Sequence, residues 1–193
     1  MELGPKNNHL KWLNLWQLVA ALVHPRNDQL VSVEYFSADA HWNSNEKRQR
    51  HTDYIAALQL TGVQTHIGAF KKVTKTCAKC QKSYKTFEEN GTDVAIASKM
   101  VQFAHQDVFD KALLFSADSD LVPIVSSIRE THPDKEIYIV TTSSRIRFAK
   151  DLRAKANGKI EIDETNFAKN LLGYKVEGPG GVILRPDAYK TDF

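Results

Sequence analysis

Apolar residues along the chain switch repeatedly between two spacings, and this predicts alternating strands and helices. Short apolar or β-branched runs predict strands over 30–36, 63–70, 111–116, 136–140 and 160–162. Apolar residues at helical spacing predict helices over 14–23, 46–60, 92–105, 121–129 and 145–156. Several strands are apolar on both sides, which is typical of a parallel sheet covered on both faces. We therefore predict an α/β fold with a mostly parallel sheet and helices on both faces.

Two segments lack this pattern. Residues 71–88 are rich in lysine and contain Cys77-Ala78-Lys79-Cys80, so we expect a basic insertion within one domain that spans residues 1–172. The tail over 173–193 contains Gly178-Pro179-Gly180-Gly181, which predicts a loop or a small hairpin.

Length and composition exclude several classes of protein. A chain of 193 residues that is 42% apolar can bury one sizeable core, which excludes disorder of the whole chain. Two cysteines are too few for a disulfide-stapled secreted domain. No stretch approaches the ~20 apolar residues of a membrane span, and the start lacks the pattern of an export signal. We expect a soluble cytoplasmic protein.

The net charge of +3 is unevenly distributed. Between Gly62 and Thr86 there is no acid, and the six lysines there are Lys71, Lys72, Lys75, Lys79, Lys82 and Lys85. The rest of the chain therefore has a net charge of −3. Such a segment indicates contact with a polyanion such as RNA, although an ordinary solvated surface is an equally good interpretation. Few aromatic residues accompany the lysines, so a platform for stacking bases is not predicted.

Acidic residues follow one of the predicted buried strands. Asp118 and Asp120 come directly after the strand over 111–116, and ligands of open parallel sheets bind beyond the carboxyl ends of strands. Asp93 begins the preceding helix, whose N-terminus lies at the same edge in a right-handed crossover. Three carboxylates there would suit Mg²⁺ or Mn²⁺. Helix capping and the helix dipole are the structural alternatives for the same acids.

With these residues in view, the chain resembles the NYN-domain family of PIN-like metal-dependent ribonucleases, and within it the LabA-like bacterial branch. Thr92-Asp93-Val94 and the element from Leu113 to Pro123 carry the resemblance, with weaker matches over 9–15 and 54–58. The Cys-x-x-Cys pair followed by 88–93 also fits that branch. The resemblance implies a Rossmann-like fold, Mg²⁺ or Mn²⁺ held by Asp93, Asp118 and Asp120 as the catalytic residues, and cleavage or binding of RNA.

One departure from the family concerns its first strand, which is central in the sheet and ends in an Asp-x-x-Asn motif. Residues Met1 to His9 contain neither an apolar strand nor an aspartate. Either the gene model is truncated or part of the site is lost, and in both cases we expect a gap or an exposed edge in the middle of the sheet. Asp39 is a conceivable substitute for the missing acid.

The leading hypothesis is a divalent-metal-dependent endonuclease that hydrolyses single-stranded RNA. The expected RNA contacts are Lys71, Lys72, Lys75, Lys79, Lys82, Arg145 and Arg147. The alternative is a catalytically impaired RNA-binding or regulatory protein on the same fold. A HAD-type phosphatase would use the Asp118-Ser119-Asp120 pattern, but its second acidic pair is missing from the sequence.

Cys77 and Cys80 form half of a zinc site, because structural zinc normally takes four ligands. His66 and His51 are the candidate partners within the chain, and a symmetry mate is the other source of ligands. A homo-oligomer is therefore left open. The basic helix predicted over 145–156 has two interpretations, phosphate binding and favourable placement of cations near a helix C-terminus.

Overall fold

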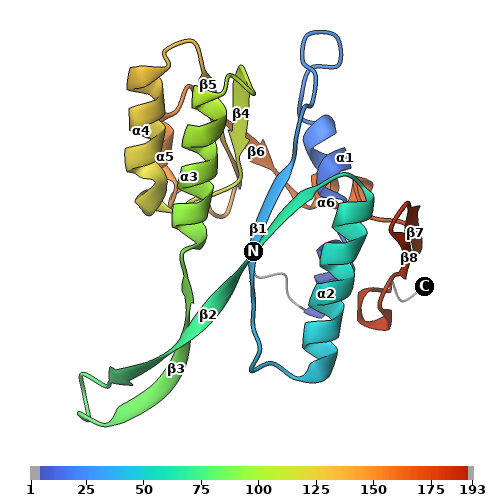
Figure 1. The fold of residues 1–193 in the computed structure, drawn as a ribbon, viewed down its shortest axis with the longest axis vertical. Helices are drawn as coiled ribbons and strands as arrows, with labels where there is room; N and C mark the ends of the chain where they lie inside the picture. The colour runs from blue at the N-terminus through green and yellow to red at the C-terminus, as the bar shows by residue number, and fades with distance from the viewer. Residues whose placement is uncertain (1–4, 191–193) are drawn as a thin grey trace.

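The computed structural model describes residues 5–190, and Figure 1 shows their arrangement. Residues 1–4 lie outside this range. Our expectations for the start of the chain, which concern an export signal and the family's first strand, therefore fall partly outside the described residues. Within the described range, none of the helices has the length and apolar character needed to cross a membrane.

The described chain is a mixed α/β structure. Its helices are α1 (Leu15–Ala20), α2 (Asn45–Leu60), α3 (Thr92–His105), α4 (Val122–Thr131), α5 (Lys150–Lys155) and α6 (Glu164–Lys169). Its strands are β1 (Glu34–Asp39), β2 (Gln64–Thr76), β3 (Ser83–Asn90), β4 (Lys111–Leu114), β5 (Glu136–Thr142), β6 (Gly158–Ile162), β7 (Lys175–Gly178) and β8 (Gly181–Leu184). Short 3-10 turns cover Pro5–Lys11, Ser119–Leu121 and Asp187–Tyr189.

The strands form two separate three-stranded sheets and a hairpin. One sheet has the order β1-β2-β3 and the other β4-β5-β6, while β7 pairs only with β8. β1 and β2 are parallel, as are all strands of the second sheet, whereas β2 and β3 are antiparallel. The expected break in the sheet is confirmed, since β1 and β4 are both edge strands. Leu113 of β4 packs against the cores on both sides of this break.

Helices cover both faces of the sheet β4-β5-β6. On one face, Ile137 and Ile139 of β5 pack with residues of α3, α4 and α5. On the other face, Val140 packs with α1, α6 and the first 3-10 turn through residues such as Leu18 and Phe167. The period-two alternation along β5 sends its apolar side chains to both faces, which explains why this segment reads as a continuous apolar run.

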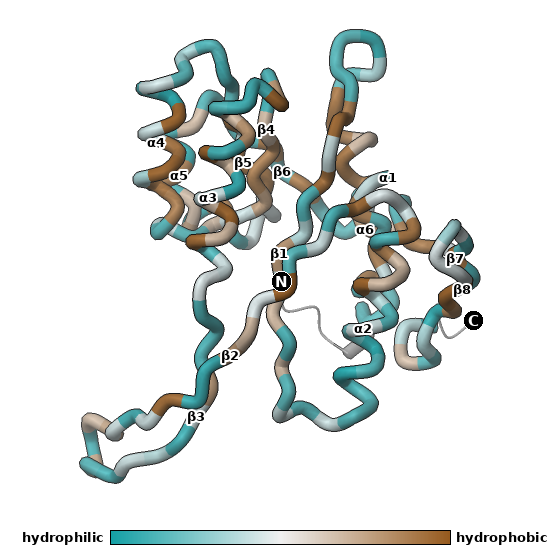
Figure 2. Tube along the Cα trace, viewed as in Figure 1, coloured by the Kyte–Doolittle hydropathy of each residue, from teal (hydrophilic) through white to brown (hydrophobic). Residues whose placement is uncertain are grey.

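Helix α2 covers the sheet that contains β1 and β2. Leu58 of α2 is fully buried against Val33 and Val63, and α1 adds Val19 to this cluster. The β7–β8 hairpin packs on the far side of α2, where Val176 joins Trp12 in a further cluster. Figure 2 shows this division, with apolar segments inside the body and a mostly hydrophilic ribbon, formed by β2 and β3, that extends away from it.

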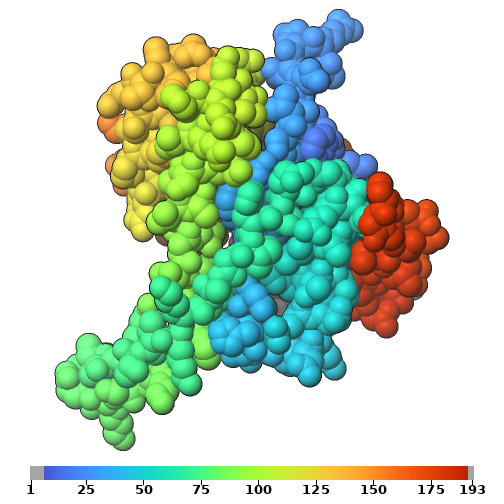
Figure 3. Space-filling view, in the orientation of Figure 1, coloured from blue at the N-terminus to red at the C-terminus, as the bar shows by residue number. Residues whose placement is uncertain are grey.

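The ribbon is the main difference from the predicted elements. We expected a strand only to Phe70 and then an insertion, but β2 continues to Thr76 and pairs with β3 in an eight-residue antiparallel ladder. The reason is the mixture of lysines with the β-branched Val73, Thr74 and Thr76 after Phe70, which suits a two-sided solvated ribbon and gives no burial signal. It projects from the molecule in Figure 3.

Two further differences lie in the second half of the chain. The helix expected over 145–156 covers only Lys150–Lys155, because residues 143–149 form turns that begin where Ile146 N–H donates to the Thr142 carbonyl. Helix α6 was not predicted, although its capping box is readable: Asp163 accepts from the backbone N–H groups of Thr165 and Asn166.

Candidate functional site

The three acids that the sequence singles out lie at the carboxyl edge of the parallel strands. β4 ends at Leu114, and Asp118 and Asp120 follow it in the loop and the 3-10 turn. The register between β2 and β3 ends at Ala69 and Asn90, so the chain re-enters the body at the carboxyl end of β1. Gly91, with φ of 91°, then turns the chain into α3, whose second residue is Asp93. The contact between α3 and the 3-10 turn brings the acids into one region.

Electrostatics show that the three carboxylates interact. Partial burial raises the pKa of Asp93, and the nearby charges of Asp118, Asp120 and Glu89 raise it further. Each of these neighbours is itself an acid, so the edge carries a concentration of negative charge. A cation bound there would relieve this repulsion.

The three acids are oxygen donors of the kind that a hard divalent cation prefers, but they are not gathered around one point. Within residues 5–190 no group of three His, Cys, Asp or Glu side chains is close enough to hold an ion. Asp118 Oδ1 accepts from the Asp120 backbone N–H at 3.0 Å and so also caps the 3-10 turn. All three side chains are exposed, which leaves room for water or phosphate oxygens as further ligands of Mg²⁺ or Mn²⁺. Asp39, the conceivable substitute, pairs instead with Arg48 at 3.0 Å.

The predicted basic residues lie in two places that flank this edge. All six lysines are exposed on the β2–β3 ribbon, which begins at the edge and extends outward (Figure 1). Lys75 is paired with Glu88, which partly neutralises its charge. Lys79 and Lys82 lie at the tip of the ribbon, farther from the acids along the ladder than Lys71 and Lys72.

Arg145 and Arg147 lie in the turns that follow β5, the strand beside β4. Both are exposed, and the Arg147 guanidinium lies 4.8 Å from the centre of the Phe148 ring, which is itself 60% exposed. Both arginines precede α5 rather than ending it, so stabilisation by the C-terminal dipole of a helix does not explain them. Their position at the carboxyl edge is compatible with phosphate contact.

Cys77 and Cys80 lie in the turn at the tip of the ribbon. The Cys77 backbone N–H donates to the Lys82 carbonyl at 2.9 Å, and the backbone N–H groups of Cys80 and Lys79 lower the pKa of the Cys77 thiol. In the part of the chain that is described, no further ligand joins the two cysteines. The two histidines considered as partners are engaged elsewhere, His51 with Ser37 at 2.9 Å and His66 with Glu34 at 2.6 Å.

An aromatic group at the base of the ribbon was missed by the sequence reasoning. Trp42, from the loop after β1, stacks on Phe87 with ring centres 4.2 Å apart and meets Phe70 edge-on at 4.4 Å. Phe70 and Phe87 are two of the few aromatic residues that accompany the lysines in the sequence, but Trp42 lies in another segment. No local pattern could have placed it there, because the contact depends on the pairing of β2 with β3 and on the path of the loop.

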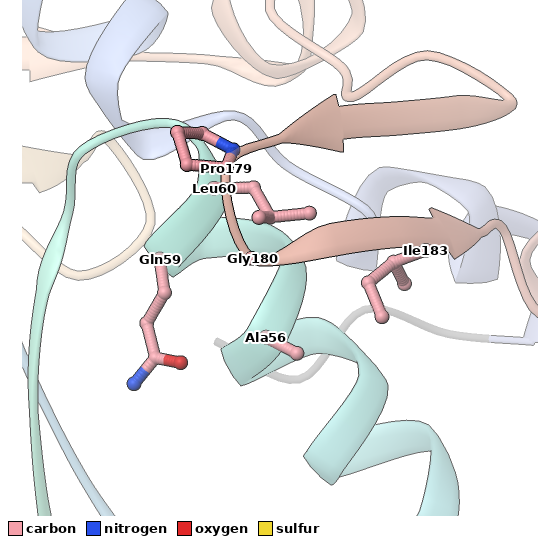
Figure 4. A pocket seen from close by; sticks show the side chains of 6 residues that line it. All are labelled: Ala56, Gln59, Leu60, Pro179, Gly180 and Ile183. Atoms are coloured by element: carbon pink, nitrogen blue, oxygen red, sulfur yellow. The ribbon is translucent and has the colours of Figure 1, made fainter.

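A pocket lies apart from these residues, between α2 and the β7–β8 hairpin (Figure 4). Its lining has no acidic, basic or nucleophilic side chain: Ala56, Gln59, Leu60, Pro179, Gly180 and Ile183. The hairpin approaches α2 closely, since a Cβ at Gly178 would lie 3.1 Å from Leu60 Cδ2. The pocket is a packing feature of the hairpin and carries no chemistry.

Comparisons with known proteins identify the family. The chain resembles a solved structure of a protein of unknown function from Vibrio parahaemolyticus, with a TM-score of 0.51, 20% identity, and coverage of 86% of this chain and 82% of that one, which supports the fold alone. The search of curated proteins returned no match. A family model described as the NYN domain matches residues 7–163. The chain therefore belongs to the NYN domain family, a PIN-like nuclease family.

Proposed function

We propose that this protein is a divalent-metal-dependent endonuclease that hydrolyses phosphodiester bonds of single-stranded RNA. The observation that supports it best is that Asp93, Asp118 and Asp120 lie in one region, where α3 contacts the 3-10 turn after β4 and where the lysine ribbon joins the body. Family membership adds the nuclease class and a metal requirement as precedents. We also place the chain in the LabA-like branch of the family, on the residues given above.

In this proposal the three aspartates would hold Mg²⁺ or Mn²⁺ through carboxylate oxygens. The metal, when bound, would lower the pKa of a water and stabilise the leaving oxygen of the phosphodiester. Lys72, near the end of the ladder that meets the edge, and Arg145 and Arg147 on the other side would bind phosphates that flank the scissile bond. Water would add to phosphorus, the P–O bond to the leaving strand would break, and the proton released by the water would end on the leaving oxygen.

Cleavage of single-stranded RNA in the presence of Mn²⁺ tests the assignment. The variant is Asp118→Asn, and the matched control is Asp110→Asn, because Asp110 is fully exposed just before the other end of the same strand. We expect cleavage by the wild type and the control and its loss in Asp118→Asn. Equal cleavage by all three proteins would refute the site.

A second candidate function is RNA binding without turnover on the same fold. Two observations favour it. The three acids do not gather around one point within the described residues, and Asp39, the conceivable substitute for the missing acid, pairs with Arg48 instead. It predicts salt-sensitive RNA binding by the wild type and no cleavage even at high Mn²⁺. The phosphatase hypothesis has lost its support, because the family match accounts for the Asp118–Asp120 element.

Zinc at Cys77 and Cys80 is a separate proposal. The N–H groups that lower the Cys77 pKa favour the thiolate that a metal requires. Since only two ligands meet at the tip within the described chain, a full site would take two further ligands from a second copy. Half a zinc per chain, together with a dimer in solution, is the expected result.

A further inference from the structure

The aromatic group at the base of the ribbon differs from the aromatic residues of the cores. Trp42 is 40% exposed, whereas Trp12 is fully buried in the body. Its ring lies nearly parallel to that of Phe87, at 7°, and His41 meets both Trp42 and Phe87 edge-on at about 5 Å. We call Trp42, Phe70 and Phe87 the aromatic platform.

The register of the ribbon places the platform on one face together with particular lysines. Residues directly opposite in an antiparallel ladder share a face, and the face alternates with every residue. Phe70 is opposite Glu89, Lys72 is opposite Phe87, and Lys85 is opposite Thr74, so Lys72 and Lys85 share the face of the platform. Lys71 and Lys75 are on the opposite face, where Lys75 is paired with Glu88.

This combination is chemically specific. Exposed aromatic rings offer π-faces on which unpaired bases stack, and cations beside them bind the phosphates of the same strand. A cluster that served only to brace the ribbon would gain more by burying the indole, since exposed apolar surface contributes nothing to folding. The same face has two lysines for which the described structure records no ion pair.

The platform is also continuous with the acidic edge. Glu89, opposite Phe70, accepts a hydrogen bond from the Thr92 hydroxyl, and Thr92 is next to Asp93. Gly68, two residues before Phe70 on the same face, lies beneath Thr92, whose hydroxyl oxygen would be 3.9 Å from a Cβ at that position. Because Gly68 has no side chain, it adds none between the platform and the start of α3, where the Thr92 hydroxyl donates to Glu89.

We propose that the aromatic platform stacks unpaired bases of single-stranded RNA, with Lys72 and Lys85 on the adjacent phosphates, and so leads the strand to the carboxylates at the sheet edge. This inference rests on the proposed function, because it names how the same site holds its substrate. It makes the ribbon a substrate-positioning element and assigns to Trp42 a role that no local motif indicates.

The test uses the full chain and a labelled single-stranded RNA. Trp42→Ala removes the exposed ring, and Trp42→Phe keeps a stacking surface. Alanine substitution of a stacking aromatic costs about 1–3 kcal/mol per base, so we expect about 5- to 140-fold weaker binding by Trp42→Ala and binding close to the wild type by Trp42→Phe. Inorganic polyphosphate, which has no bases, should bind equally well to all three proteins.

Tryptophan fluorescence gives an independent measurement. Trp12 is buried and Trp16 half-buried, so quenching on addition of RNA would report mainly on Trp42 and should disappear in Trp42→Phe. Thermal unfolding followed by circular dichroism verifies that each variant is folded, and if Trp42→Ala unfolds, the quenching comparison between wild type and Trp42→Phe decides.

The outcomes separate the two proposals. RNA binding by the wild type with unchanged affinity in Trp42→Ala, or quenching that persists in Trp42→Phe, would overturn the stacking role and leave the proposed function standing. A wild type that neither binds nor cleaves RNA would overturn both. Equal losses of RNA and polyphosphate binding in Trp42→Ala would also overturn stacking, because the loss would then not depend on bases.

Discussion

Because the lysines of the β2–β3 ribbon are divided between two faces, specific lysine–phosphate contacts can be distinguished from a general effect of positive charge. Replacing Lys72 and Lys85 by glutamine removes two charges from the platform face, whereas replacing Lys71 and Lys75 removes two charges from the opposite face. All four side chains are exposed, so both double variants should stay within about 1 kcal/mol of wild-type stability. The variants match in net charge, and the replaced lysines lie along the same stretch of the ladder.

The expected magnitude follows from counterion release. Each lysine–phosphate contact with a single strand contributes about −0.7 to the slope of log Kobs against log salt concentration, so Lys72→Gln with Lys85→Gln should flatten the slope by about 1.4. Between about 50 and about 200 mM salt, the wild type should therefore lose about sevenfold more affinity than this variant does. The Lys71→Gln and Lys75→Gln protein should keep a slope close to that of the wild type, since Lys75 is already paired with Glu88.

Fluorescence anisotropy of a labelled single-stranded RNA, titrated at several salt concentrations, measures both slopes. Equal flattening by the two double variants would refute the assignment of one binding face. A slope unchanged in both would mean that the ribbon does not contact phosphates at all. The second result would move the search for the RNA path to the arginine turn after β5.

Three further predictions concern stability and reactivity. Leu58→Ala should lower the free energy of unfolding by about 2–5 kcal/mol in urea titrations, because Leu58 is fully buried, and a smaller loss would mean that the cluster around it is loosely packed. The rate of Cys77 alkylation by iodoacetamide, followed by mass spectrometry, should have its pH midpoint below the ordinary thiol value of 9.0. The reason is that N–H groups of Cys80 and Lys79 lower the pKa of the Cys77 thiol, and a midpoint at or above 9.0 would contradict the turn geometry. Hydrogen bonds to Asp107 and Asp134 raise the pKa of Lys135 above its ordinary 10.5, so the pair stabilises the fold fully below that pH and the stabilisation is lost as pH rises through the raised pKa. Lys135→Met should thus lower the melting temperature at pH 7 by an amount that shrinks in alkaline solution, and a difference independent of pH would contradict the ion pair.

Local patterns predicted most of the elements because they depend on neighbours along the chain. The helix expected over 92–105 coincides with α3, and the strands expected from 111 and 136 begin at those residues. These segments combine a clear apolar period with glycine or polar residues at their ends. The prediction of a helix over 145–156 was wrong for its first five residues, because their backbone groups form hydrogen bonds in turns. The same residue composition permits both structures.

The sequence by itself determined the α/β class, the acids beyond β4 and the basic character of 71–88, since each depends on residue type and spacing. Tertiary structure decided what those residues do together. The pairing of β2 with β3 divided the lysines between two faces, the crossover through α3 brought Asp93 within range of the charges of Asp118 and Asp120, and the loop after β1 laid Trp42 on Phe87. Each of these contacts joins segments that are distant in sequence, and only the closing of the chain into sheets fixes which distant side chains meet.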